Sequence, residues 1–119
     1  MSIRPDDIDP MAIHEVGAFG KFEMEAAAAA IIAYAQHRGE ADRGPFRLGQ
    51  LVDFASDRRN LPWHHPKRLP GEPAEMGRDL ALLSEYGWVA IQGREVVVSD
   101  AFWERCFEKA PVKRKTETP

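Results

Sequence analysis

A helix with almost no polar surface is the strongest constraint on how this chain can fold. Residues 19–37 contain five consecutive alanines, at positions 26–30, and alanine is the strongest helix former. Gly39 follows, and glycine commonly ends a helix. Because few charges lie on any face of this helix, we expect neighbouring elements to cover several of its sides. It lies either at the centre of the domain or in a contact with a second copy of the chain.

The composition is typical of one globular domain. The 119 residues are 44% hydrophobic and 29% charged, which suits a single domain with its own core. The one cysteine excludes an intrachain disulfide and a zinc site with several cysteines. No apolar run reaches the ~18–20 residues of a membrane span, and the first residues lack the apolar core of a signal peptide. We therefore expect a cytoplasmic protein without a membrane partner.

The two ends of the chain differ from its middle. Pro5 and Pro10 interrupt residues 1–18 and three aspartates solvate them, so this segment is predicted to be a flexible N-terminal arm. The folded domain is expected over residues 19–110. Residues 111–119 are rich in lysine and arginine and are expected to form a disordered basic tail.

Turn residues separate the other predicted elements. Leucines at helical spacing predict two further helices, and β-prone residues on both sides of Gly93 predict a hairpin. Asp100 is the expected N-cap of a last helix. These elements are expected at residues 46–57, 73–86, 88–98 and 101–109. The predicted fold is mainly α, with one small β-hairpin.

The end of the third helix has a distinctive sequence. Residues 79–89 are DLALLSEYGWV: a Leu-x-x-Leu helix face, a glycine for a tight exit and a strand that turns back at once. Together with the order of elements, this stretch resembles the helix-to-wing junction of the winged helix-turn-helix superfamily, over about residues 20–99. The last helix is an addition to that pattern. The resemblance implies a third helix in the DNA major groove, a hairpin tip on the neighbouring backbone or minor groove, and usually a homodimer.

The segment between the second and third helices is the strongest candidate for DNA contact. Residues 58–68 carry four bases and no acid, with a tryptophan that can stack and prolines that keep the segment open. The alternative is a solvated insertion whose Trp63 packs on the core. The full set of candidate nucleic-acid-binding residues is Arg58, Arg59, Trp63, His64, His65, Lys67, Arg68, Arg78 and Arg94.

Two functions are compatible with these features. The first is a DNA-binding winged helix, either a small transcription regulator or an accessory of a replication or mobile-element system. The second is a protein-interaction or dimerisation module without DNA binding. It is favoured by the chain's net charge of −3 and by Glu72, Glu75 and Asp79 in or beside the third helix. A homodimer would use the alanine-rich helix and the C-terminal helix, where Trp103 and Phe107 lie.

Catalytic and metal-binding patterns are absent from the sequence. There is no glycine-rich phosphate loop, nucleophile elbow or His-Glu-x-x-His motif, so we expect no enzyme and no cofactor. His64 and His65 are adjacent and would point opposite ways on an extended chain, so we expect no metal site. Cys106 lies between aromatic residues and is predicted to be a buried, inert thiol.

Overall fold

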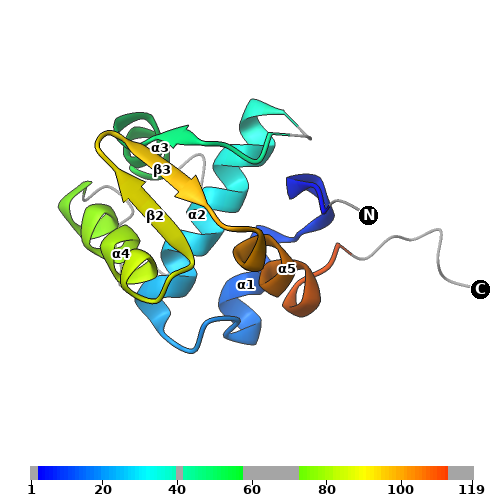
Figure 1. Ribbon diagram of the computed structural model, residues 1–119. Coiled ribbons are helices and arrows are strands. Elements are labelled where there is room, and N and C mark those ends of the chain that lie inside the picture. Colours follow the sequence, from blue (N-terminus) through cyan, green and yellow to red (C-terminus); the bar gives the residue numbers. More distant parts are fainter. Residues whose placement is uncertain (1–2, 40–41, 58–72, 113–119) are drawn as a thin grey trace, which may run out of the picture.

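The computed structural model describes residues 3–39, 42–57 and 73–112 and is mainly helical, with one small sheet (Figure 1). Within these described residues, a 3-10 turn, η1, precedes five α-helices and three strands. In chain order the elements are η1 (Pro5–Asp7), α1 (Pro10–Val16), α2 (Phe22–Arg38), β1 (Phe46–Arg47), α3 (Leu48–Ala55), α4 (Pro73–Glu85), β2 (Val89–Gln92), β3 (Glu95–Val98) and α5 (Asp100–Lys109).

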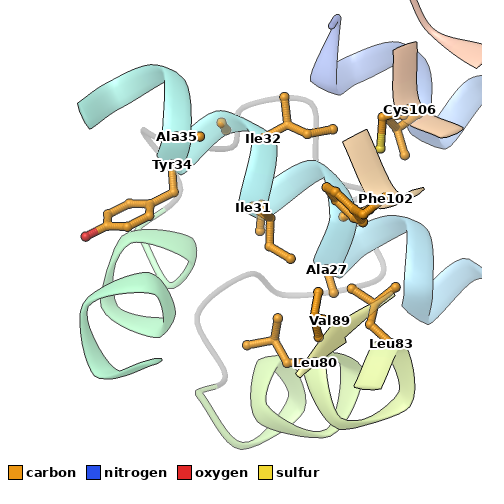
Figure 2. Packing of buried hydrophobic residues seen from close by; sticks show 14 of the residues in the cluster. Ala27, Ile31, Ile32, Tyr34, Ala35, Leu80, Leu83, Val89, Phe102 and Cys106 are labelled. Atoms are coloured by element: carbon orange, nitrogen blue, oxygen red, sulfur yellow. The ribbon is translucent and has the colours of Figure 1, made fainter. Parts of the chain in front are cut away.

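The alanine-rich helix α2 forms the centre of the fold. Twelve consecutive residues of this helix, 24–35, are buried. Elements η1, α1, α3 and α4 all pack against it. Figure 2 shows Ala27 and Ile31 of α2 in the same core as Leu80 and Leu83 of α4. Of the two arrangements that the sequence left open, the central position is therefore confirmed.

The sheet has one strand more than the predicted hairpin. All pairs are antiparallel and the strand order is β1-β3-β2. Phe46 pairs with Val96 and both side chains are buried, whereas Arg47 pairs with Glu95 and both are exposed. The centroid of the Phe46 ring also lies 5.4 Å from that of the Tyr34 ring on α2. The prediction of a helix from residue 46 is wrong by two residues, because this pairing keeps them extended.

The flexible arm expected over residues 1–18 is instead part of the fold from residue 3 on. Pro5 and Pro10 open short helices, where a missing backbone N–H is harmless. Ile8 and Ile13 are fully buried. Gln36 of α2 donates hydrogen bonds from Nε2 to the carbonyl oxygens of Pro5 and Ile8, at 3.0 and 2.8 Å.

The loop between α1 and α2 is held by two charged side chains. Glu25 is only 6% exposed, and its Oε1 accepts hydrogen bonds from the backbone N–H groups of Phe19 and Gly20, at 3.3 and 3.1 Å. Arg105 of α5 donates from Nε to the Ala18 carbonyl oxygen at 2.8 Å. The buried carboxylate of Glu25 thus has partners, and α5 is tied to the loop between α1 and α2.

The junctions on both sides of the β2–β3 hairpin are tight. After α4, Gly87 adopts a φ of 81°, and the Trp88 N–H donates to the Leu83 carbonyl oxygen at 3.0 Å. Ser99, one residue before the predicted cap Asp100, is the N-cap of α5, and its side chain accepts from the Phe102 N–H at 3.2 Å. The Ser99 hydroxyl also donates to the Trp88 carbonyl oxygen at 2.7 Å, which closes the base of the hairpin.

The last described residues pair with the N-terminal segment. Ile8 and Pro111 form an antiparallel bridge, in which the Val112 N–H donates to the Asp7 carbonyl oxygen at 2.9 Å. The first two residues of the predicted disordered tail are therefore paired with the N-terminal segment. Residues 113–119 lie outside the described residues.

Candidate nucleic-acid interface

The structure describes two of the nine candidate residues, Arg78 on α4 and Arg94 in the β2–β3 turn. Both side chains are exposed. The other candidates belong to the segment that joins α3 to α4. Arg58, Arg59, Trp63, His64, His65, Lys67 and Arg68 lie outside the described residues, so the prediction for this segment is neither confirmed nor contradicted.

Helix α4 presents one apolar face inward and one mixed face outward. Met76, Leu80 and Leu83 are buried against the core, in the spacing that the sequence predicted. Arg78 and Glu85 are exposed, so the described part of the outward face carries one charge of each sign.

Asp79 is one of the three acids that favoured a module without DNA binding, and that interpretation assumed an accessible side chain. That assignment is wrong, because only 4% of the Asp79 residue surface is exposed. Its carboxylate therefore does not contribute an open negative charge to the outward face. The argument that an acidic third helix repels DNA loses one of its three acids, and Glu72 lies outside the described residues.

The hairpin tip brings together two arginines, one of which the sequence did not single out. Arg94 follows Gly93, whose φ of 62° forms the turn, and the Arg94 carbonyl oxygen accepts from the Leu48 N–H at 2.8 Å. Arg47, just before Leu48, is exposed on β1, and its pairing partner Glu95 is the residue after Arg94. Arg47 could not be found from sequence, because its place depends on the pairing of β1 with β3.

Among the described residues, the main contacts of the N-terminal helix α1 do not include α4. Helix α4 packs against α2, α3 and β2, whereas α1 packs against α2 and α5. Figure 1 shows α4 on one side of α2, and α1 and α5 on the other. DNA binding through the third helix requires such an uncovered face, and among the described residues the N-terminal helix packs elsewhere.

The predicted dimer surface is mostly used inside the chain. Residues 24–35 of α2 are buried by this chain's own elements, so they cannot meet a second copy. On α5, Phe102 and Trp103 are fully buried. Their rings are in edge-to-face contact, with centroids 5.2 Å apart. Phe107 alone among the large hydrophobic side chains of α5 is exposed, at 40%. Residues 24–35 of α2 and the Phe102–Trp103 pair of α5 are therefore used inside the chain, and the homodimer stays a prediction.

The remaining predictions concern the thiol of Cys106, a metal site and a membrane span. Cys106 is fully buried, and this burial raises the pKa of its thiol far above the ordinary value, so the thiol stays protonated and unreactive. Among the described residues, no group of three or more His, Cys, Asp and Glu side chains could hold a metal ion. No described helix is both long and apolar enough to cross a membrane.

Comparisons with known proteins give no match. No family model matches the chain, and neither a curated protein nor a solved structure is significantly similar to it.

Proposed function

We propose that this chain is a winged-helix module that binds duplex DNA, mainly through phosphate contacts. The observation that carries this proposal is the order of elements from α2 to β3, with α4 packed on the core and the β2–β3 hairpin directly after it. In such a module α4 takes the place of the recognition helix and the β2–β3 turn takes the place of the wing.

The charged side chains of the described residues favour contact with the DNA phosphates over recognition of the bases. Arg78, Arg94 and Arg47 are exposed around α4 and the hairpin tip, and residues 58–68 add four bases beside the start of α4 in the sequence. Glu85 and Glu95 are exposed near them, so the surface is not strongly positive. Phosphate contacts carry no direct sequence information, so we expect low sequence specificity, as in a small transcription regulator or an accessory of a replication or mobile-element system.

The test is fluorescence anisotropy with a labelled duplex of arbitrary sequence, across a salt series that starts near ~50 mM. We expect micromolar binding that weakens steeply as salt rises. The double variant Arg47→Ala, Arg94→Ala should reduce the salt slope by up to ~2, because each phosphate contact contributes about one unit. The control is Arg4→Ala, since Figure 1 shows η1, which follows Arg4, on the side of α2 away from α4.

Two outcomes contradict the proposal: no binding at the lowest salt, or an equal loss of slope in the Arg4→Ala control. The same series examines residues 58–68. Replacing Arg58 and Arg59 by alanine should weaken binding about equally for all duplex sequences. An unchanged slope in that variant removes the segment from the interface and leaves α4 and the hairpin as the candidates.

A protein-interaction module is the second candidate, because aromatic side chains remain exposed at the end of α4. Tyr86 is 55% exposed and Phe22 at the start of α2 is 41% exposed. Lys21 Nζ lies 5.8 Å from the centre of the Tyr86 ring, so this ring already accepts a cation. Aromatics and arginines are enriched at protein interfaces. This function predicts no duplex binding at low salt.

A further inference from the structure

Two loops meet where α4 ends and α2 begins. Figure 1 shows the turn after α4 beside the start of α2. The rings of Phe19 and Trp88 join the two loops in an edge-to-face contact, with centroids 5.1 Å apart. The Phe19 ring also stacks on the Phe102 ring of α5, at a centroid distance of 5.5 Å. The two loops are therefore packed on each other and on the core.

Hydrogen bonds fix the backbone of both loops. Before α2, the buried Glu25 carboxylate accepts from the N–H groups of Phe19 and Gly20. After α4, the Tyr86 N–H donates to the Leu82 carbonyl oxygen at 3.2 Å. Side chains on these loops are thus held in place before a partner arrives, which lowers the cost of binding.

The two loops expose aromatic rings beside acidic side chains. Tyr86 is 55% exposed and Phe22 is 41% exposed. Glu85 precedes Tyr86, Glu23 follows Phe22, and both acids are exposed. With Lys21 these residues form what we call the aromatic surface, which holds two acids and one base. A phosphate would meet two like charges there, whereas a cation would be attracted.

Lys21 shows where a cation fits on this surface. Its Nζ lies 5.8 Å from the centre of the Tyr86 ring, within the ~6 Å over which the face of a ring attracts a cation. Residues 82–85, the described last turn of α4, contain no base, so the negative end of this helix also favours a cation. The planar guanidinium of an arginine stacks on a ring and donates to carboxylates at the same time, which an ammonium group does less well.

We propose that the aromatic surface binds an arginine-containing segment of a partner protein, with the guanidinium on the Tyr86 ring in place of Lys21. This inference rests on the protein-interaction candidate above, because it names the partner chemistry for the same aromatic side chains. The surface is small. Interfaces below the standard size of roughly 800 Å² per partner are weak, so we expect a micromolar Kd.

The experiment is fluorescence anisotropy of a labelled peptide of alternating arginine and glycine, titrated with the full chain. Tyr86→Ala should weaken peptide binding by about fivefold, because it removes the ring on which the guanidinium stacks. Tyr86→Phe keeps the ring and should bind the peptide almost as well as the original chain. Position 86 is exposed, so circular dichroism should show both variants folded. Equal binding by the original chain and Tyr86→Ala overturns the proposal.

Lys21→Ala gives the sharpest test, because its expected effect is a gain. Removing the competing cation should tighten peptide binding by roughly twofold to fivefold. The matched control is Lys109→Ala, which removes the same charge from an exposed position on α5 and should leave the Kd almost unchanged. Weaker peptide binding by Lys21→Ala, or an equal gain in the control, contradicts the proposal. A single-stranded oligonucleotide that binds through Tyr86 and is weakened by Lys21→Ala would make nucleic acid the occupant instead.

A second peptide, with glutamate in place of arginine, separates this inference from the function on which it rests. If the glutamate peptide binds through Tyr86 and the arginine peptide does not, the protein-interaction candidate stands and the arginine assignment is wrong. Absence of binding by both peptides also overturns the inference. Duplex binding is measured independently, because its variants are Arg47→Ala and Arg94→Ala. Loss of peptide binding with retained duplex binding therefore contradicts this inference alone.

Discussion

Helices α2 and α4 are both packed in the core, yet they expose very different amounts of surface. Residues 24–35 of α2 are buried on every side, whereas α4 buries Leu80 and Leu83 and exposes Arg78 and Ala81. Side-chain size explains the contrast. Alanines allow neighbouring backbones to approach from all directions, while leucines on one face dock a helix and leave its other face open. The enclosed helix organises the fold, and the half-open helix is where a partner can bind.

The largest expected effect is on the docked face of α4. Leu80→Ala should lower the free energy of unfolding by about 2–5 kcal/mol, because it removes a fully buried side chain and leaves a cavity. Leu82→Ala is the control, since Leu82 is only half-buried in the same helix. Urea unfolding measures both. An equal loss in the two variants would mean that α4 has no distinct docked face.

Replacing an alanine with leucine should give the second-largest difference in stability between variants of α2 and α4. Ala28→Leu in α2 should destabilise the protein by about 1–3 kcal/mol, because a fully buried alanine has no space for a larger side chain. Ala81→Leu on the exposed face of α4 should change stability by less than about 0.5 kcal/mol. The measurement is again urea unfolding. Tolerance of leucine at position 28 would contradict the enclosed position of α2.

The buried carboxylate at the start of α2 should have a smaller effect. Glu25→Gln keeps an oxygen that can accept from the Phe19 and Gly20 N–H groups but removes its charge, so a loss of about 1 kcal/mol is expected. Glu23→Gln, on an exposed neighbour in the same turn, should lose only a few tenths, about 0.3 kcal/mol. Thermal unfolding of the two variants is the comparison, and equal losses would assign the effect to the helix dipole alone.

Substitutions on the outward face of α4 should change DNA binding and leave the free energy of unfolding almost unchanged. Arg78→Ala should change the free energy of unfolding by less than about 0.5 kcal/mol, because the side chain is exposed. In the anisotropy titration it should reduce the salt slope by ~1. Glu85→Ala on the same face should strengthen binding, since it removes a negative charge. Equal changes in the same direction would show that α4 does not face the phosphates.

Sequence reasoning predicted well the elements that depend on local pattern. The helix predicted at 73–86 is Pro73–Glu85, and the hairpin predicted at 88–98 is formed by Val89–Gln92 and Glu95–Val98. Proline at the helix start, glycine after its end and the run of β-prone valines at 96–98 are signals that act over only a few residues. The coarse prediction of a mainly α protein with a small sheet is confirmed on this basis.

Features that depend on distant partners could not be predicted in this way. Phe46 and Arg47 are a strand only because Val96 and Glu95 pair with them. Likewise, residues 5–16 looked flexible because their prolines and aspartates are prominent in the sequence. The isoleucines that anchor them, Ile8 and Ile13, are buried only once α2 and its neighbours are in place. The same dependence on distant partners explains why the sequence did not single out Arg47 and why Asp79 was taken to be exposed.

The enclosure of α2 also determines which amino-acid substitutions this protein can accept during evolution. In an ordinary surface helix, positions that resist substitution recur every three or four residues, and those between them vary. Residues 26–30 are all buried, so five adjacent positions share one restriction to small side chains. A survey of all single substitutions would find an unbroken block of intolerance there. Any relative of this chain should be found more readily by that block of small residues than by its surface.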